Sequence, residues 1–485
     1  MKTTAVSLLF VFASPLAAQS GGVNQPPLAF TGVHIVDVVT GQTSPARTVV
    51  IDGGRIASLD GPVPPQARRI PADGLYVIPG LWDMHVHLRS AARRPDAPLI
   101  EENAGFLDLF LPHGVLGIRE MGGDLADTVL RWRGEINTGK RIGPRILTAG
   151  RKIDGAPPTW PGSLTVTTPQ EARAAVRQMK QSGVDFIKAN FNRADLTLLQ
   201  AVTDEAHKHN LRVTGHWPFN LPVQLLPESG MDAIEHSDHL IPPRLADFEQ
   251  FQRESNARLG TAWALGQEEI LARRLYLRDP ANAGAFSRTL AAKPVWITPT
   301  LFVEQVLRVD LATRDFSSDT RARFIFPALW ETWDPKTGLR SAPQGRSREL
   351  LIESAGQSRR AVAAAHQAGV PMIAGSDCGA NNNYLFPGWS LHDELELLVR
   401  SGITPADALR MTTINAARWR GDADREGSVE VGKAAELVLL RGNPLTRIGN
   451  TREVESVIRG GHYYSRGDLD RMLADVERRV RSARR

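Results

Sequence analysis

Hydrophobic and polar positions follow a strand-like spacing at both ends of the chain. Short apolar runs separated by glycine turns occupy residues 28–78, and similar runs return at 427–440 and 454–464. Short alternating runs with glycine between them are typical of antiparallel β structure. The two flanks therefore predict one small β-sandwich, assembled from N-terminal and C-terminal segments.

The long central region alternates strand-like and helix-like segments, which is the pattern of a parallel sheet with crossover helices. The capping box Thr168-Pro169-Gln170-Glu171 marks a helix expected to reach Lys180, and Thr404-Pro405-Ala406-Asp407 marks another. Eight strands are predicted, at residues 81–88, 115–120, 145–149, 185–190, 212–217, 233–236, 295–301 and 371–377. Eight such units in a closed ring predict an α/β fold, a (β/α)8 TIM-like barrel beside the β-sandwich.

The N-terminus has the pattern of a signal peptide over residues 1–18. Lys2 precedes a short apolar core at 5–13, and small residues at 15–18 suit cleavage near Ala18. The apolar run is too short to span a bilayer. We therefore expect an exported protein, periplasmic or secreted, without stable membrane insertion.

After cleavage the chain is expected to divide into four parts. The first part of the sandwich, the barrel, the second part of the sandwich and a basic C-terminal helix are expected at residues 26–78, 79–420, 421–466 and 467–485. Two barrel connections, residues 240–294 and 304–348, are long and follow strands. Both are expected to overhang the face on which such barrels carry their active sites.

Composition and charge support a globular protein with a large core. The 485 residues are 42% hydrophobic and 23% charged, with a net charge of +5. Much of that charge lies in residues 477–485, which favours a solvated helix end over a nucleic-acid surface. Cys378 is the only cysteine, so no intrachain disulfide is expected.

Histidines on the first predicted strand of the barrel indicate a metal site. Alternate side chains of a strand share one face, so His85 and His87 project together and can hold one cation. Four further polar residues end later strands at corresponding positions: Lys188, His216, His236 and Asp377. Residues from the carboxyl ends of barrel strands meet at one mouth, so all six are expected to converge there.

The order H-x-H, Lys, His, His, Asp resembles the binuclear branch of the amidohydrolase superfamily, especially its prolidase-like and ochratoxinase-like members. Residues 183–188 match the Gly-x-Asp-Phe-Ile-Lys pattern of these relatives, and residues 432–440 are similar to the family's sandwich pattern, with Glu436 in place of Asp. Residues 155–160 depart from it, reading Gly-Ala-Pro-Pro-Thr-Trp where relatives often have Gly-Gly-His. The resemblance implies a hydrolase of amide bonds, and the departure concerns its substrate.

The resemblance also implies cofactors and a mechanism. It implies two divalent metal ions, with N6-carboxylysine at Lys188 bridging them. By position, the first ion would be held by His85, His87 and Asp377, and the second by His216 and His236. We interpret the metal as zinc, although manganese, cobalt and iron suit the same ligands. A metal-bridged hydroxide would attack a small-molecule amide, in a dipeptide or an N-acyl amino acid, with Asp377 as proton shuttle.

Further residues are candidates for support of the site or contact with substrate. Arg119 is expected to form an ion pair with Glu120 that supports the site. Others follow strand ends, where they would either contact substrate or pack in the core: His239, Trp217, Tyr384 and Trp160. The histidines in connections and helices are expected to be structural: His113, His366 and His392.

Two other functions are compatible with the sequence. The same centre could hydrolyse an ester, a lactone or a phosphotriester, because the same nucleophile attacks each of these groups. A catalytically inactive binding protein on this scaffold is the second, since a fold does not determine a function. A decayed site is expected to lack at least one ligand, whereas all six are present. A homo-oligomer is compatible with each of these functions.

Overall fold

The computed structural model describes residues 26–89, 99–258, 275–293, 295–334, 342–379 and 381–484. The expected signal peptide at residues 1–18 lies outside this part of the chain. No helix in the described ranges is both long enough and apolar enough to cross a membrane.

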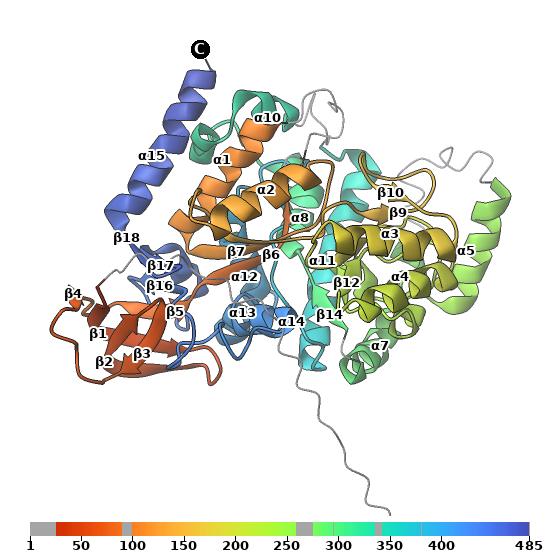
Figure 1. Cartoon of the computed structure of the whole chain (residues 1–485). Helices are drawn as coiled ribbons and strands as arrows, with labels where there is room; N and C mark the ends of the chain where they lie inside the picture. Colours follow the sequence, from red (N-terminus) through yellow and green to blue (C-terminus); the bar gives the residue numbers. More distant parts are fainter. Residues whose placement is uncertain are drawn as a thin grey trace, which may run out of the picture.

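Both flanks of the chain combine in one β unit, as the sequence predicts. The strands pair in one mixed sheet with the order β18-β17-β16-β5-β1-β2-β3 and β4 paired to β1, whereas the glycine-punctuated runs predicted antiparallel pairing throughout. The sheet has an apolar core of its own, and the Ile56 N–H on its edge strand β3 donates to the Lys433 carbonyl over 2.9 Å. In Figure 1 its first strands (red) lie beside its last strands (blue) at one end of the molecule. Its strands are β1 (Leu28–Asp37), β2 (Gln42–Asp52), β3 (Arg55–Leu59), β4 (Arg68–Pro71), β5 (Tyr76–Pro79), β16 (Leu437–Leu440), β17 (Val454–Arg459) and β18 (His462–Ser465).

The barrel strands form two arcs, each made of parallel strands, in the orders β15-β6-β7-β8 and β10-β9-β11-β12-β13-β14. Backbone hydrogen bonds join the arcs on both sides. The Asp185 N–H donates to the Thr148 carbonyl over 3.0 Å, and the Ile297 N–H donates to the Pro371 carbonyl over 2.9 Å. The strands are β6 (Leu81–His87), β7 (Val115–Glu120), β8 (Arg145–Thr148), β9 (Ile153–Asp154), β10 (Leu164–Thr165), β11 (Ile187–Ala189), β12 (Val213–Gly215), β13 (Ala233–Glu235), β14 (Trp296–Thr298) and β15 (Cys378–Gly379). The α/β class and the barrel are thus confirmed.

The eighth barrel strand differs from its predicted form. Residues 371–377 make a single parallel bridge at Met372, and regular pairing with β6 begins only at Cys378. Asp377 has a φ of 57°, which bends the backbone out of an extended conformation before β15. The apolar run predicts the position of this segment correctly, but the bend limits its regular strand to two residues.

Helices surround the two arcs (Figure 1). Both predicted helix starts are confirmed: Thr168 and Glu171 form the capping box of α3, and the Thr404 side chain accepts a hydrogen bond from the Asp407 N–H at the start of α13. The main helices are α1 (Ile100–Phe110), α2 (Ala126–Asn137), α3 (Pro169–Gln181), α4 (Leu196–Lys208), α11 (Gly345–Gln367), α12 (Trp389–Arg400), α13 (Pro405–Met411), α14 (Ile414–Arg420) and α15 (Arg466–Ala483).

The two long connections contain helices of their own. The first includes α5 (Leu245–Arg258) and α7 (Pro280–Ala292), and the second includes α8 (Leu301–Gln305), α9 (Leu311–Thr313) and α10 (Pro327–Thr332). Asp238 links them, because its carboxylate lies 3.2 Å from Arg278 Nη2 and 2.7 Å from Arg308 Nη2. Burial raises the pKa of Asp238, but the two arginines outweigh this effect and lower it. The connections are therefore held to each other, and their role as lids stays a prediction.

Gly215, the last residue of β12, gives a test of the barrel packing. A Cβ atom at this position would lie 1.8 Å from the Ala189 carbonyl oxygen on the neighbouring strand. That carbonyl also accepts the hydrogen bond of the His216 N–H, so it has little freedom to move. Gly215→Ala should lower stability by about 1–3 kcal/mol or more, as overpacking does. Thermal unfolding followed by circular dichroism measures the change.

Gly134→Ala is the matched control. Gly134 lies within α2, and a Cβ there would meet nothing within 4 Å. Alanine favours a helix interior by about 1 kcal/mol over glycine, so this variant should unfold at the same or a higher temperature. Equal unfolding temperatures for Gly215→Ala and the unmodified protein would contradict the contact between β11 and β12.

Candidate metal centre

Three of the predicted ligands converge at the ends of β6 and the eighth strand segment. The Nε2 atoms of His85 and His87 lie 3.3 Å apart, since both side chains project from one face of β6. Asp377 Oδ1 lies 3.4 Å from His85 Nε2 and 3.2 Å from His87 Nε2. Three donor atoms at these mutual distances suit one shared cation.

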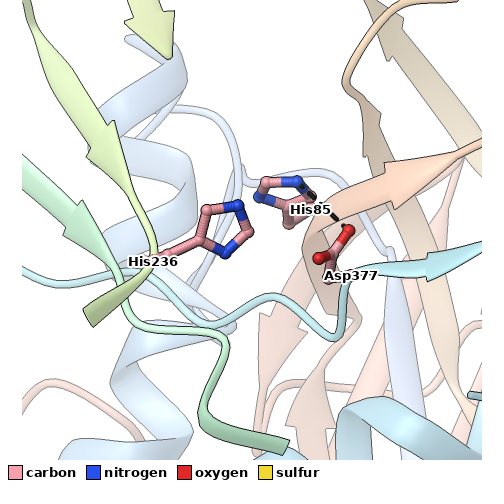
Figure 2. Close-up of side chains that lie close together, drawn as sticks. All are labelled: His85, His236 and Asp377. Carbon is pink, nitrogen blue, oxygen red and sulfur yellow. Dashed lines mark ion pairs between the residues drawn. The ribbon is translucent and has the colours of Figure 1, made fainter. Parts of the chain in front are cut away.

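A second pair of histidines lies beside this group. His216 follows β12 and His236 follows β13, and their Nε2 atoms are 3.0 Å apart. The ring centroids of His85 and His236 are 5.1 Å apart. Ligand atoms of His85, His236 and Asp377 all lie within 4.8 Å of one another, and Figure 2 shows these side chains pointing toward one another.

The histidines are in the form that binds a metal. Burial lowers the pKa of all four, and it lowers that of His236 to about 3. Neutral imidazole keeps a lone pair on its unprotonated nitrogen, which is the donor in metal complexes.

Lys188 on β11 is the sixth predicted ligand and is fully buried. Its Nζ forms no hydrogen bond with any described residue. Burial lowers its pKa to about 8, although Glu235 and Asp377 oppose the shift. A buried amine without an acceptor is unfavourable, and partial deprotonation makes it a nucleophile toward carbon dioxide. The donor set therefore fits a binuclear centre with carboxylated Lys188.

Residues outside the predicted set orient two of the histidines. His85 Nδ1 lies 2.7 Å from Glu235 Oε2, and His236 Nδ1 lies 2.7 Å from Thr300 Oγ1. A partner at Nδ1 fixes the ring and turns Nε2 toward the centre. Burial raises the pKa of Glu235, but Arg119 and His85 outweigh it, so this carboxyl has a pKa well below its usual range.

Strained backbone and a buried carboxylate position Asp377. Asp377, His236 and Thr300 have φ values of 57°, 70° and 48°, which are unfavourable for residues other than glycine. Asp83 accepts hydrogen bonds from the Ser376 N–H (2.8 Å) and the Ser376 hydroxyl (2.6 Å) next to the bend. The Asp377 N–H donates to the His85 carbonyl over 2.8 Å. These bonds compensate for the strain and aim the carboxylate at the histidines.

The predicted ion pair between Arg119 and Glu120 is wrong. Arg119 Nη2 lies 2.9 Å from Glu235 Oε1, whereas Glu120 accepts a hydrogen bond from the Thr148 hydroxyl over 2.6 Å. Neighbouring residues on a strand point to opposite faces, so Arg119 and Glu120 cannot share one face of β7. The guanidinium also lies 4.5 Å from the ring centroid of Trp419. Arg119 nevertheless supports the site, through Glu235.

The predicted wall residues lie in packed surroundings. Trp217 is buried, and its indole N–H donates to the Leu221 carbonyl over 2.8 Å. Tyr384 is buried and stacks on Phe316 with ring centroids 3.9 Å apart. His239 is half-buried in the turn after β13. Contact of these residues with a substrate stays a prediction.

The histidines expected to be structural do contact the scaffold. His392 Nε2 donates to the His113 carbonyl over 3.0 Å, and its Nδ1 lies 2.9 Å from Thr451 Oγ1. His366 lies 3.3 Å from Asp407.

Comparisons with known proteins agree with the predicted resemblance. The model of the amidohydrolase family matches residues 76–463. An adenine deaminase of Deinococcus radiodurans is 28% identical over 161 residues, or 32% of this chain, and the match spans only 28% of that relative's length.

Solved structures match nearly the whole chain. A Xaa-Pro dipeptidase with bound methionine has a TM-score of 0.65 at 21% identity, covering 90% of this chain and 100% of that one. A bottromycin amidohydrolase has a TM-score of 0.72 at 22% identity, covering 96% and 94%. The ochratoxinase of A. niger has a TM-score of 0.60 at 18% identity, covering 91% and 96%. These likenesses confirm the prolidase-like and ochratoxinase-like fold.

Replacing Arg119 tests its support of the centre. Arg119→Met should leave the Glu235 carboxylate buried without its cation, which costs about 3–5 kcal/mol for pairs of this kind. The matched control is Arg131→Met, because Arg131 is exposed and lies 3.7 Å from Glu135. An exposed pair contributes about 0–1 kcal/mol, so the control should change stability little. Thermal unfolding of the two variants measures the difference, and equal losses would contradict the role of Arg119.

Proposed function

Because the chain belongs to the amidohydrolase family, we propose that it is a metal-dependent hydrolase of carbon–nitrogen bonds. Its substrate is the amide of a dipeptide or an N-acyl amino acid. The observation that carries the proposal is the approach of imidazole and carboxylate donors from different barrel strands to within a few ångströms of one another. Neutral imidazole nitrogens and a carboxylate oxygen that face one another at such distances are a donor set suited to divalent cations.

Each donor has a place in the proposed centre. Zinc is the metal that we propose, and its two ions would supply water activation and carbonyl polarisation. Lys188, as N6-carboxylysine, would offer two carbamate oxygens as further ligands. His85, His87 and Asp377 would hold the first ion, and His216 and His236 would hold the second.

Asp377 carries the proton. Burial raises the pKa of its carboxyl, but His85 and His87 outweigh this effect and hold it well below the usual range. The carboxylate is therefore ionised at neutral pH and can accept a proton from the attacking water. It then passes this proton to the departing amine, as a general base followed by a general acid.

One feature of the sequence extends the proposal. The N-terminal pattern supports export to the periplasm or the exterior.

Hydrolysis of an ester, lactone or phosphotriester needs the same donors, so only substrate tests separate these activities from amide hydrolysis. The inactive binding protein is disfavoured because all six ligand positions are filled.

Metal removal tests the function directly. The purified protein should hydrolyse members of a panel of N-acyl amino acids and dipeptides faster than lactones or a phosphotriester. Chelation should abolish this turnover. Zinc with bicarbonate should restore it, and zinc in carbon-dioxide-free buffer should restore it less, because the Lys188 carbamate forms from carbon dioxide. Full turnover with no bound metal, shown by elemental analysis, would refute the proposal.

Asp377→Asn tests the proton shuttle. The variant should keep its fold and much of its metal, because the histidines and Lys188 remain. An amide side chain accepts no proton, so turnover of an amide should fall by about 10²–10⁴-fold. An activated ester should lose less, because its leaving group needs no proton. Metal content and turnover on both substrates are measured. Equal, mild losses would restrict Asp377 to metal binding and make His239 the next candidate.

A further inference from the structure

Two cations lie beside the candidate metal centre but outside its ligand set. Arg89 follows β6, two residues after His87, and Lys152 immediately precedes β9 in the connection after the third barrel strand. Both side chains contact one half-buried indole ring. Arg89 Cζ lies 4.0 Å and Lys152 Nζ 4.8 Å from the ring centroid of Trp160. Two elements far apart in sequence therefore bring two positive charges onto one aromatic surface.

No carboxylate of the described residues pairs with the Lys152 amine. The residue is 2% exposed, and its Nζ makes no hydrogen bond or ion pair within the described part of the chain. Its backbone is fixed, because the Leu164 N–H donates to the Lys152 carbonyl over 2.8 Å. Glu120 is a nearby acid, but its carboxylate accepts the Thr148 hydroxyl. The ring of Trp160 compensates for only part of the cost of burying this charge.

Both cations lie next to strand positions that carry proposed ligands. Ile153, the residue after Lys152, pairs with Ala189, the residue after Lys188, and Arg89 lies two residues after His87. Burial and the repulsion from Arg89 lower the pKa of Lys152. An anion that contacted both side chains would remove this repulsion. The amine is thus close enough to the centre for one small molecule to reach both.

We infer that Arg89 and Lys152 bind the free carboxylate of the substrate. Guanidinium offers a planar pair of donors to a carboxylate, and ammonium adds a point charge. Trp160 holds both cations in place through its ring face. The inference rests on the proposed function and deepens it: Arg89 and Lys152 are the residues that recognise the free carboxyl group beside the scissile bond.

Paired substrates test the inference through a split between KM and kcat. The best N-acyl amino acid of the panel is compared with its carboxamide. Lys152→Met should raise KM for the acid by about 10- to 100-fold, the range expected for a hydrogen bond to a charged group. It should leave kcat nearly unchanged, because the contact holds substrate and transition state alike. KM for the carboxamide should not change.

Three variants complete the comparison. Lys140→Met removes an exposed lysine and should change neither substrate's KM. Lys152→Arg keeps the charge and should retain the preference for the acid. Trp160→Leu should raise KM for the acid, because both cations lose their shared support. Equal KM values for acid and carboxamide in the unmodified protein, or equal losses for both in Lys152→Met, would overturn the inference.

Binding without turnover separates this inference from the proposed function. Calorimetry compares a panel of N-acetyl-L-amino acids with their carboxamides, on protein of measured metal content. At least one acid should bind more tightly than its carboxamide, and Lys152→Met should remove that difference while metal content and unfolding temperature stay the same. No acid binding above its carboxamide would overturn the carboxylate site. Preferential acid binding without hydrolysis of any panel member would instead refute the proposed function.

Discussion

A buried ion pair inside the barrel holds the ligand-bearing strands in register. Arg119 donates to Glu235 and to the Thr298 hydroxyl, while Glu235 accepts hydrogen bonds from the Thr214 hydroxyl and from His85. These contacts connect β6, β7, β12, β13 and β14. The interior of such barrels is usually filled with apolar side chains. Here a charged layer replaces them, and its desolvation cost is offset only while every partner is present.

Strand periodicity explains why the site could be predicted from sequence. His85 and His87 share a face because they are two residues apart, and parallel strands bring Lys188, His216 and His236 to the same rim. The same period includes Asp83, which precedes His85 by two residues and holds Ser376. The spacing of residues along the strand did not distinguish Asp83, which anchors Ser376, from an ordinary strand residue.

Local sequence patterns could not predict contacts between residues that are far apart in the sequence. Glu235 sits next to His236 in sequence, but its pairing with Arg119 joins positions 116 residues apart. The bend at Asp377 depends on the hydrogen bonds of Asp83, so the apolar run at 371–377 indicated a longer strand than forms. The sequence also indicated the length of the two long barrel connections. It did not indicate that Asp238 joins them, because this contact depends on arginines 40 and 70 residues away.

The two-ended sheet has a consequence for the order of folding. β5 lies between β1 and β16, so one of its edges has a partner from the first tenth of the chain and the other a partner from the last. During synthesis the early strands therefore wait, with an open edge, until residues 437–465 have emerged. Such sequence-distant pairing slows folding and leaves an edge exposed to other chains. Until the last strands have been made, the first flank therefore lacks the partner of one β5 edge, however far the barrel between the two flanks has folded.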